Sequence, residues 1–171
     1  MLYGVPTWVD EILTALAKQV VAKGGFTADR VFESLADDGD LLDNPPADRF
    51  VTIRPMSFPA GVPAVTGGGR LLAGFDGVFR LALFCRVSSD QELRDARFLK
   101  DQSRGILKQL QAIYSALEQF TPVNATGDCI LRQPLRVTQF DIQPRKVARS
   151  GWGVASSTWL APFSANIPAT I

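Results

Sequence analysis

The densest set of side chains that could do chemistry is acidic. Asp37, Asp38, Asp40 and Asp43 all lie within the stretch ADDGDLLDNPPAD. Carboxylate oxygens on a flexible loop are the ligands that Ca²⁺ prefers, but an EF-hand has alternating ligands closed by a glutamate, and this spacing does not follow that pattern. We therefore expect no metal ion here. The interpretation is an exposed acidic loop, either solvated or in contact with a basic neighbour, since its glycine and paired prolines interrupt helices and strands.

A second distinctive set of side chains is basic. Residues 132–149 contain Arg132, Arg136, Arg145, Lys146 and Arg149. Such clusters neutralise phosphates and so supply most non-specific affinity for nucleic acid. Aromatic side chains that would stack on bases are not interleaved with these cations, and no nucleic-acid-binding motif occurs. An ordinary turn or a protein interface is the preferred interpretation, with a nucleic-acid-associated module as the alternative.

Signs of catalysis are weak. The chain has no histidine, which removes the commonest general acid and base. Its one glycine run, TGGGR at residues 66–70, lacks the Gly-Lys-Ser/Thr ending of a phosphate-binding loop. We expect neither an enzyme nor a bound cofactor.

The totals favour one soluble domain over residues 1–171. The chain is 46% hydrophobic and 20% charged, which is typical of a globular protein with a full core. It contains neither an apolar run long enough to span a bilayer nor a secretion signal, so we expect a cytoplasmic product that does not enter membranes. Its two cysteines, Cys85 and Cys129, are expected to be free thiols.

Charge is distributed unevenly along the chain. Residues 1–48 carry nine acidic and three basic residues, whereas residues 49–171 carry eight acidic and fifteen basic ones. Asymmetry of this kind is typical of an interaction surface.

The first half of the chain predicts one helix and then strands. Apolar residues recur at helical spacing from Trp8 to Val20, with Thr7 as the N-cap and Gly24 as the stop. The stretch DRVFESL favours a short strand over a helical turn, and RFVTIRP favours a strand that ends at Pro55.

Two further strand regions enclose a long helical pattern. In GRLLAGFDGVFRLALFCRV, residues 74–77 predict a bulge or a wide hairpin. Residues 90–120 have an apolar stripe at helical spacing, which Leu107 and Tyr114 widen and which we expect to pack as core. A kink or break is expected near residues 103–105. The stretches CILRQPLRVTQFDI and GWGVASSTWLAPFSANI then predict strands joined by the basic turn QPRKVARSG, with Pro134 and Pro162 at edges or bulges. The order predicts an α+β fold, a mostly antiparallel sheet packed by an N-terminal helix and one long central helix.

One predicted strand, VFRLALFCRV, has two unlike faces. Phe79, Leu81, Leu83, Cys85 and Val87 form one apolar face, which we expect to lie under the long helix. The other face contains Arg80, Phe84 and Arg86, and we expect it to contact a second layer, either the N-terminal helix or a neighbouring subunit. On this hypothesis Arg80→Glu or Arg86→Glu impairs assembly more than folding.

The layout resembles the tail terminator, or tail-completion, proteins of tailed bacteriophages. The features that carry the resemblance are the helix WVDEILTALAKQVV, the strand RFVTIRP, the strand and helix FRLALFCRVSSDQELRDARFLKD with GILKQLQAIYSAL, and the closing strands PLRVTQFDI and GWGVASSTWL. No short motif is shared residue by residue, so no site residue transfers from the family.

The resemblance implies a structural role in the virion tail or neck. Family members assemble into a ring, usually hexameric, that caps the tail tube, ends its growth and joins it to the head connector. The implied partners are copies of the same chain, the tail tube protein and head-connector or neck proteins, with DNA at most passing through the ring. Assembly would take place in the host cytoplasm. Another neck or head-completion protein is the alternative.

The charge asymmetry suits such a ring, because each patch in it meets a different patch on the next copy. The candidate interface residues are Arg80, Phe84, Arg86, Asp37, Asp38, Asp40, Asp43, Arg145, Lys146 and Arg149.

Overall fold

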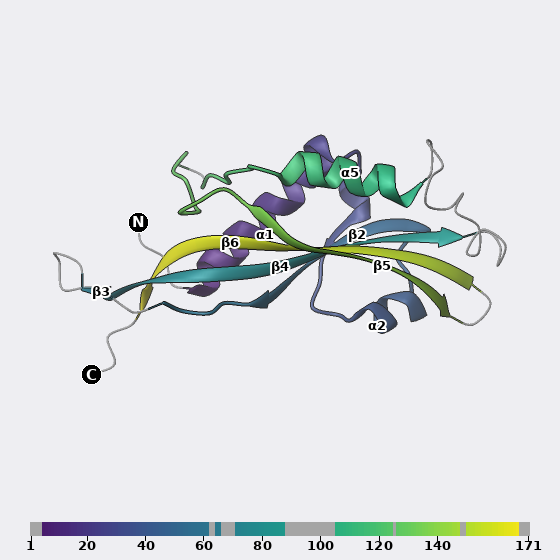
Figure 1. Cartoon of the computed structure of the whole chain (residues 1–171), viewed down its shortest axis with the longest axis horizontal. Helices are drawn as coiled ribbons and strands as arrows, with labels where there is room; N and C mark the ends of the chain where they lie inside the picture. Colours follow the sequence, from purple (N-terminus) through teal and green to yellow (C-terminus); the bar gives the residue numbers. More distant parts are fainter. Residues whose placement is uncertain are drawn as a thin grey trace.

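The computed structural model describes residues 5–61, 64–65, 71–87, 105–124, 126–147 and 150–167. A mixed six-stranded sheet forms its central layer, two helices cover one face, and one short helix lies on the other (Figure 1). The elements are α1 (Val5–Lys23), a 3-10 turn (Ala28–Arg30), β1 (Val31–Glu33), α2 (Asp38–Asp43), β2 (Arg49–Ser57), β3 (Ala64–Val65), β4 (Leu71–Val87), α5 (Ile106–Leu117), β5 (Arg136–Val147) and β6 (Ser150–Ile167). The α+β class is thus confirmed.

The strands run in the order β1-β2-β4-β6-β5, and β3 pairs with β4 beside this path. Only β1 and β2 pair in parallel, while every other pairing among the described strands is antiparallel. The predicted short strand within DRVFESL is therefore present as β1. Because β1 and β5 are at the two ends of this order, each has a strand neighbour on one side only.

Strand β4 is the middle strand in the order of the sheet and runs unbroken for 17 residues. Its register with β6 is continuous from Leu71 to Val87, so the bulge or hairpin predicted at residues 74–77 is wrong. Close packing explains the glycine at position 77. A Cβ atom built there would lie 2.9 Å from the carbonyl oxygen of Ala161 and 3.1 Å from the Phe163 ring.

Helix α1 follows the predicted apolar spacing, with Trp8, Ile12, Leu16 and Val20 buried. It already includes Val5, so Thr7 lies inside the helix and the prediction that it caps the helix is wrong. The end is as expected. Gly24 donates a backbone hydrogen bond of 2.8 Å to Val20, and Gly25 follows at φ 79°.

The main core lies between the sheet and helices α1 and α5. Phe79, Leu81, Leu83 and Cys85 of β4 belong to it and are at most 6% exposed, which confirms the predicted core face. Helix α5 begins directly after Gly105, where a break was expected; residues 90–104 of the predicted long helix lie outside the described residues. Each apolar side chain buried here contributes about 1.5–3 kcal/mol.

Two segments predicted as irregular are ordered elements. The acidic stretch contains helix α2, whose N-cap Asp37 accepts a hydrogen bond of 2.9 Å from the Asp40 amide. Strand β5 continues to Val147, through most of the predicted turn QPRKVARSG.

Prolines within the strands occupy positions where one side lacks a full partner strand. β2 passes through Pro55 because β1 pairs only with Val51 to Ile53. Pro162 of the inner strand β6 lies beyond Leu160, the last residue of β6 that β5 reaches. On that side the Arg132 amide donates to the Pro162 carbonyl oxygen at 2.7 Å, so the predicted edge position is not what the structure shows.

Candidate interaction surfaces

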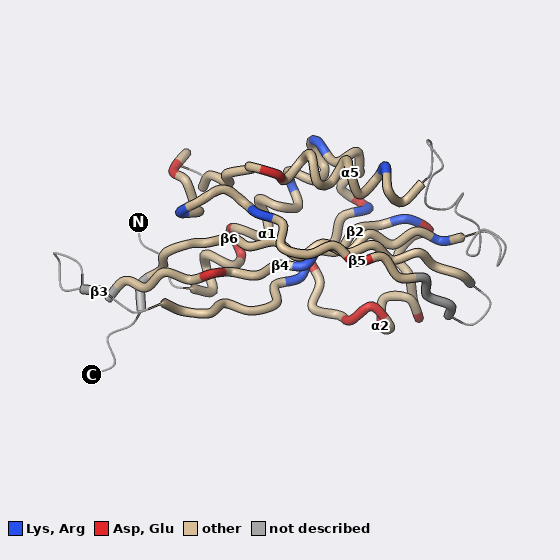
Figure 2. The backbone as a smooth tube through the Cα atoms, viewed as in Figure 1, with Lys and Arg blue, Asp and Glu red and all other residues tan. Residues whose placement is uncertain are grey.

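The second face of β4 is tied to α2 by an ion pair. The Arg80 guanidinium donates hydrogen bonds of 2.7 Å to both carboxylate oxygens of Asp38, and each side chain is only 18% exposed. Arg54, opposite Arg80 on β2, donates one of 3.3 Å to the carbonyl oxygen of Ala36. Two arginines of the sheet thus hold the segment that leads into α2. Figure 2 shows acidic positions on α2 and basic positions in the nearby strands.

Phe84 lies in a small second core on this face. Its ring stacks on Phe50 at 4.6 Å between centroids with 7° between the planes, and Trp152 meets Phe50 edge-on at 6.1 Å. Leu42 of α2 belongs to the same cluster, and Phe84 is fully buried. Phe84 is therefore a core residue, in contrast to its predicted role at a partner interface. The layer that contacts this face is α2 of the same chain, because α1 lies on the opposite face (Figure 1).

Arg86 stays at the surface. Its guanidinium pairs with Asp48 at 3.0 Å while both side chains are at least half exposed, and its backbone N–H donates to the Asp48 carbonyl oxygen at 2.8 Å. The strand's basic face and the acidic stretch thus contact each other within one chain at two places. The sequence suggested this attraction but not that it is intramolecular.

The four aspartates have separate roles. Asp37 caps α2 and Asp38 binds Arg80, while Asp40 and Asp43 are exposed. Across the described ranges, no three His, Cys, Asp or Glu side chains come together in an arrangement that could hold a metal ion.

The predicted basic stretch is divided among different elements. Arg132 pairs with Asp76 at 3.4 Å, and its guanidinium occupies the space above Gly74. Arg136 begins β5 and is exposed. Arg145 and Lys146 belong to β5, but their side chains are outside the described parts, as is the whole of Arg149.

Both cysteines are free thiols, as predicted, and they lie in different surroundings. Burial raises the pKa of the Cys85 thiol to about 12, and its Sγ donates to the Gln109 side-chain oxygen at 3.6 Å. Cys129 is exposed on a loop.

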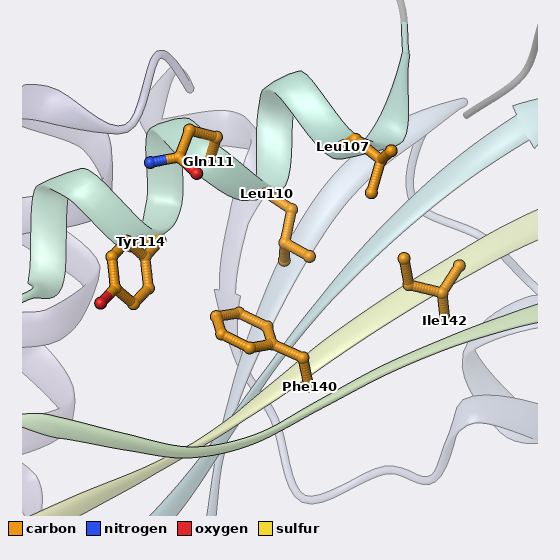
Figure 3. Close-up of a pocket in the computed structure, with 6 residues that line it drawn as sticks. All are labelled: Leu107, Leu110, Gln111, Tyr114, Phe140 and Ile142. Atoms are coloured by element: carbon orange, nitrogen blue, oxygen red, sulfur yellow. The ribbon is translucent and has the colours of Figure 1, made fainter. Parts of the chain in front are cut away.

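An apolar groove lies between α5 and β5. Its volume is about 370 Å³, and it is lined by Leu107, Leu110, Gln111, Tyr114, Phe140 and Ile142 (Figure 3). Leu107, Phe140 and Ile142 remain 42%, 45% and 37% exposed. Phe140 and Ile142 lie on the face of the sheet that the helices cover, but β5 is the strand at the end of the sheet. The two helices do not fully cover β5, so the Phe140 and Ile142 side chains stay partly exposed.

The sequence interpretation missed this groove. It assigned Leu107 and Tyr114 to a widened core stripe. It placed Phe140 and Ile142 in a predicted strand without predicting that they are exposed. The signal in the sequence was the width of the apolar stripe on this helix. A helix that covers a sheet with one face needs apolar residues only on that face, so apolar residues beyond it indicate an additional apolar surface.

Tyr114 closes one end of the groove. Its ring lies 5.8 Å from that of Phe140 and 6.0 Å from that of Trp159. Its hydroxyl donates to Glu118, and this hydrogen bond raises the pKa of Tyr114. The neutral phenol therefore presents an apolar ring to the groove.

The comparisons with known proteins bear on the fold. No family model matches the chain, and no curated protein matches its sequence. Among solved structures, the chain is similar to one from "Virion of native gene transfer agent (GTA) particle", with a TM-score of 0.53. The alignment covers 92% of this chain and 97% of the other at 11% identity. The two chains share a fold. In the described part of this chain, no helix has the length and apolar character needed to cross a membrane.

Proposed function

We propose that this chain is a structural, non-enzymatic subunit of a phage-like virion. In this role it forms a ring at the head-proximal end of the tail tube, ends tube growth and provides the joint to the head connector. The observation that carries the proposal is the shared fold with a chain of a gene transfer agent virion over nearly the full length of both chains. The same particle context supports a location in a virion. The position in the tail or neck and assembly in the host cytoplasm are part of the proposal.

The surfaces of the chain support assembly as its role. Three large apolar side chains stay exposed around one groove, beside a 12-residue edge strand. Clustered exposed apolar side chains and unpaired strand edges are the features through which proteins associate. A ring made from one kind of chain uses two different patches on each copy, so each copy has other copies as partners. The proposed position of the ring adds the tail tube protein and the head connector as partners.

The test is assembly with purified components. The protein alone, and mixed with tail tubes that lack their terminal ring, is measured by light scattering and imaged by negative-stain electron microscopy. We expect closed rings, and tubes with a cap at one end. Rings that bind head connectors but leave tubes uncapped would identify the alternative, a different neck or head-completion protein. A monomer that binds neither tubes nor connectors would overturn the proposal.

A nucleic-acid module based on residues 132–149 receives less support, because Arg132 already pairs with Asp76. It predicts DNA binding at low salt that falls steeply as salt is added. A binding titration in the same preparation measures this directly.

A further inference from the structure

Strand β5 is an open edge of the sheet beside the groove. In the described part of the chain, β6 is its only strand neighbour. Open edges present backbone N–H and C=O groups to other chains, and proteins protect them with bulges and prolines. β5 has both, because its register shifts between Val137 and Gln139 and it contains Pro144. Residues 139–143, between these two devices, have no such protection.

The outward backbone groups of this stretch belong to Phe140 and Ile142. On the β5 side of β6, the Pro162 carbonyl oxygen accepts from the Arg132 amide. The register of β6 on β4 is continuous, so the even-numbered residues of β6 all point their backbone groups toward β5. Their partners are the odd-numbered residues of 139–143. The N–H and C=O groups of Phe140 and Ile142 therefore point away from the sheet.

The side chains of the same two residues point toward α5 (Figure 3). Phe140 and Ile142 remain 45% and 37% exposed, and Leu107 and Tyr114 of α5 line the groove above them. A strand added to this edge would place alternate side chains in the groove while its backbone bonded to the outward groups. A helix would satisfy only the groove, because its own N–H and C=O groups are already paired. The edge and the groove together therefore specify an extended strand.

Asp141 determines which residue fits between the two apolar ones. Its side chain lies on the face of the sheet opposite to those of Phe140 and Ile142. On that face its neighbours along β5, Gln139 and Gln143, are neutral, and Gln143 donates a hydrogen bond to it. Opposite charges on directly opposed residues of two strands attract. The matching strand therefore has a basic residue between two apolar ones.

Neither end strand of a second copy has this pattern. Pairing Phe140 of one copy with Ile142 of another would set two Asp141 carboxylates directly opposite each other, which is unfavourable. The other end strand, β1, covers only Val31–Glu33. Its Glu33 lies on the helix side, as Val31 does, and would bring a carboxylate to the groove. The occupant is therefore a different chain.

We infer that residues 139–143 of β5 accept an extended segment of a different protein chain as an added antiparallel strand. Two apolar side chains of that segment enter the groove against Phe140 and Ile142, and a basic side chain between them lies opposite Asp141. This inference goes beyond the proposed function and does not depend on it.

Peptide binding to the full chain tests the added strand. The probe is fluorescein-labelled Ser-Thr-Val-Lys-Ile-Thr-Ser, and fluorescence anisotropy measures its dissociation constant. We expect saturable binding. The control is the same peptide N-methylated at Val and Ile, which keeps both side chains but removes the two N–H groups that pair with Phe140 and Ile142. It should bind about tenfold more weakly. Absence of binding, or equal binding of the two peptides, would overturn the inference.

A charge exchange tests the position of the strand. The native chain should prefer the Lys peptide over the same peptide with Glu in its place by about fivefold, the size of one strong cross-strand pair. Asp141→Lys should reverse this preference. If the preference stays the same in the variant, the basic residue does not lie opposite Asp141 and the inference is wrong.

A charge placed in the groove tests the apolar contact. Ile142→Asp should weaken binding of the Lys peptide by at least about tenfold, the cost of a charge at a contact that excludes water. Met56→Asp is the matched control, because Met56 is also half exposed, at 49%, but lies on β2. Circular dichroism confirms that both variants fold. Equal weakening by the two variants would contradict binding at this site.

The remaining outcomes separate this inference from its alternatives. Oligomers of the native chain that the Lys peptide disperses would show that another copy occupies the edge, and would overturn the choice of a different chain. Rings that cap tubes but bind no peptide would overturn this inference alone. Specific peptide binding by a chain that caps no tubes and binds no connectors would uphold it while the proposed function fails.

Discussion

Arg80 and Asp38 form a two-fold hydrogen-bonded ion pair, 2.7 Å at both contacts, that fastens helix α2 to the sheet. Each side chain is only 18% exposed, so the pair is shielded from water. It joins residues 42 positions apart and closes the second core over Phe84. The relationship changes what Arg80 is expected to do. We therefore expect the loss of Arg80 to affect folding, whereas the sequence alone predicts a larger effect on assembly.

Removal of the Arg80 guanidinium should destabilise the protein. Arg80→Met leaves the Asp38 carboxylate partly buried without its partner, which costs about 1.5–3 kcal/mol of unfolding free energy. Urea denaturation followed by fluorescence measures it. Arg86→Met is the matched control, and since the Arg86–Asp48 pair is half exposed or more, its loss should cost about 1 kcal/mol or less. Equal losses from the two variants would contradict the distinction between them.

Phe84 should behave as a core residue. Phe84→Ala empties space between Phe50 and the rest of the second core, which costs about 3–5 kcal/mol. Thermal unfolding by circular dichroism checks this. Phe140→Ala provides the contrast, because Phe140 is 45% exposed and its removal should cost the monomer far less. A Phe84→Ala protein as stable as the native one would place Phe84 outside the core.

Gly77 should not tolerate a side chain. Gly77→Ala places a Cβ 2.9 Å from the Ala161 carbonyl oxygen, and the backbone of β6 must move to accept it. Overpacking of this kind costs about 1–3 kcal/mol. Gly74→Ala is the control, because its Cβ would meet only the tip of the flexible Arg132 side chain. Chemical denaturation of both variants should rank Gly77→Ala as the less stable.

Cys85 should make stability fall at alkaline pH. Its pKa in the folded chain is about 12, above the ordinary value of 9.0, so between these values the unfolded chain loses a proton that the folded chain keeps. The free energy of unfolding therefore decreases as pH rises from 9 toward 12. At pH 10, one pH unit above the ordinary pKa, this effect amounts to about 1 kcal/mol.

The measurement is urea denaturation at pH 8 and pH 10 for the native chain and for Cys85→Val. Only the difference between the two proteins reports on the thiol, since other groups titrate equally in both. A drop of the same size in the variant would show that Cys85 is not the cause. A fast reaction of Cys85 with a thiol reagent in the folded protein at pH 8 would do so as well.

Regular periodicity explains which elements could be predicted. The spacing of Trp8, Ile12, Leu16 and Val20 specifies an apolar helical face whatever it packs on, and the alternation from Phe79 to Val87 does the same for a strand. Both were confirmed. Local turn chemistry was less informative. Gly74, Gly77 and Pro55 normally mark interruptions, yet β4 and β2 run through them, because a close neighbouring strand needs glycine and an uncovered edge permits proline.

The sequence by itself determined the α+β class, the main apolar faces, and the presence of acidic and basic surfaces that attract each other. Only the tertiary structure decided which charges meet within the chain and which surfaces stay open. Asp38 and Asp48 pair with Arg80 and Arg86, whereas the groove between α5 and β5 stays open at the β5 end of the sheet. The physical reason is that the spacing of apolar residues shows which face of a single helix or strand is apolar. The strand order and the width of the helical layer depend instead on contacts between residues far apart in the chain.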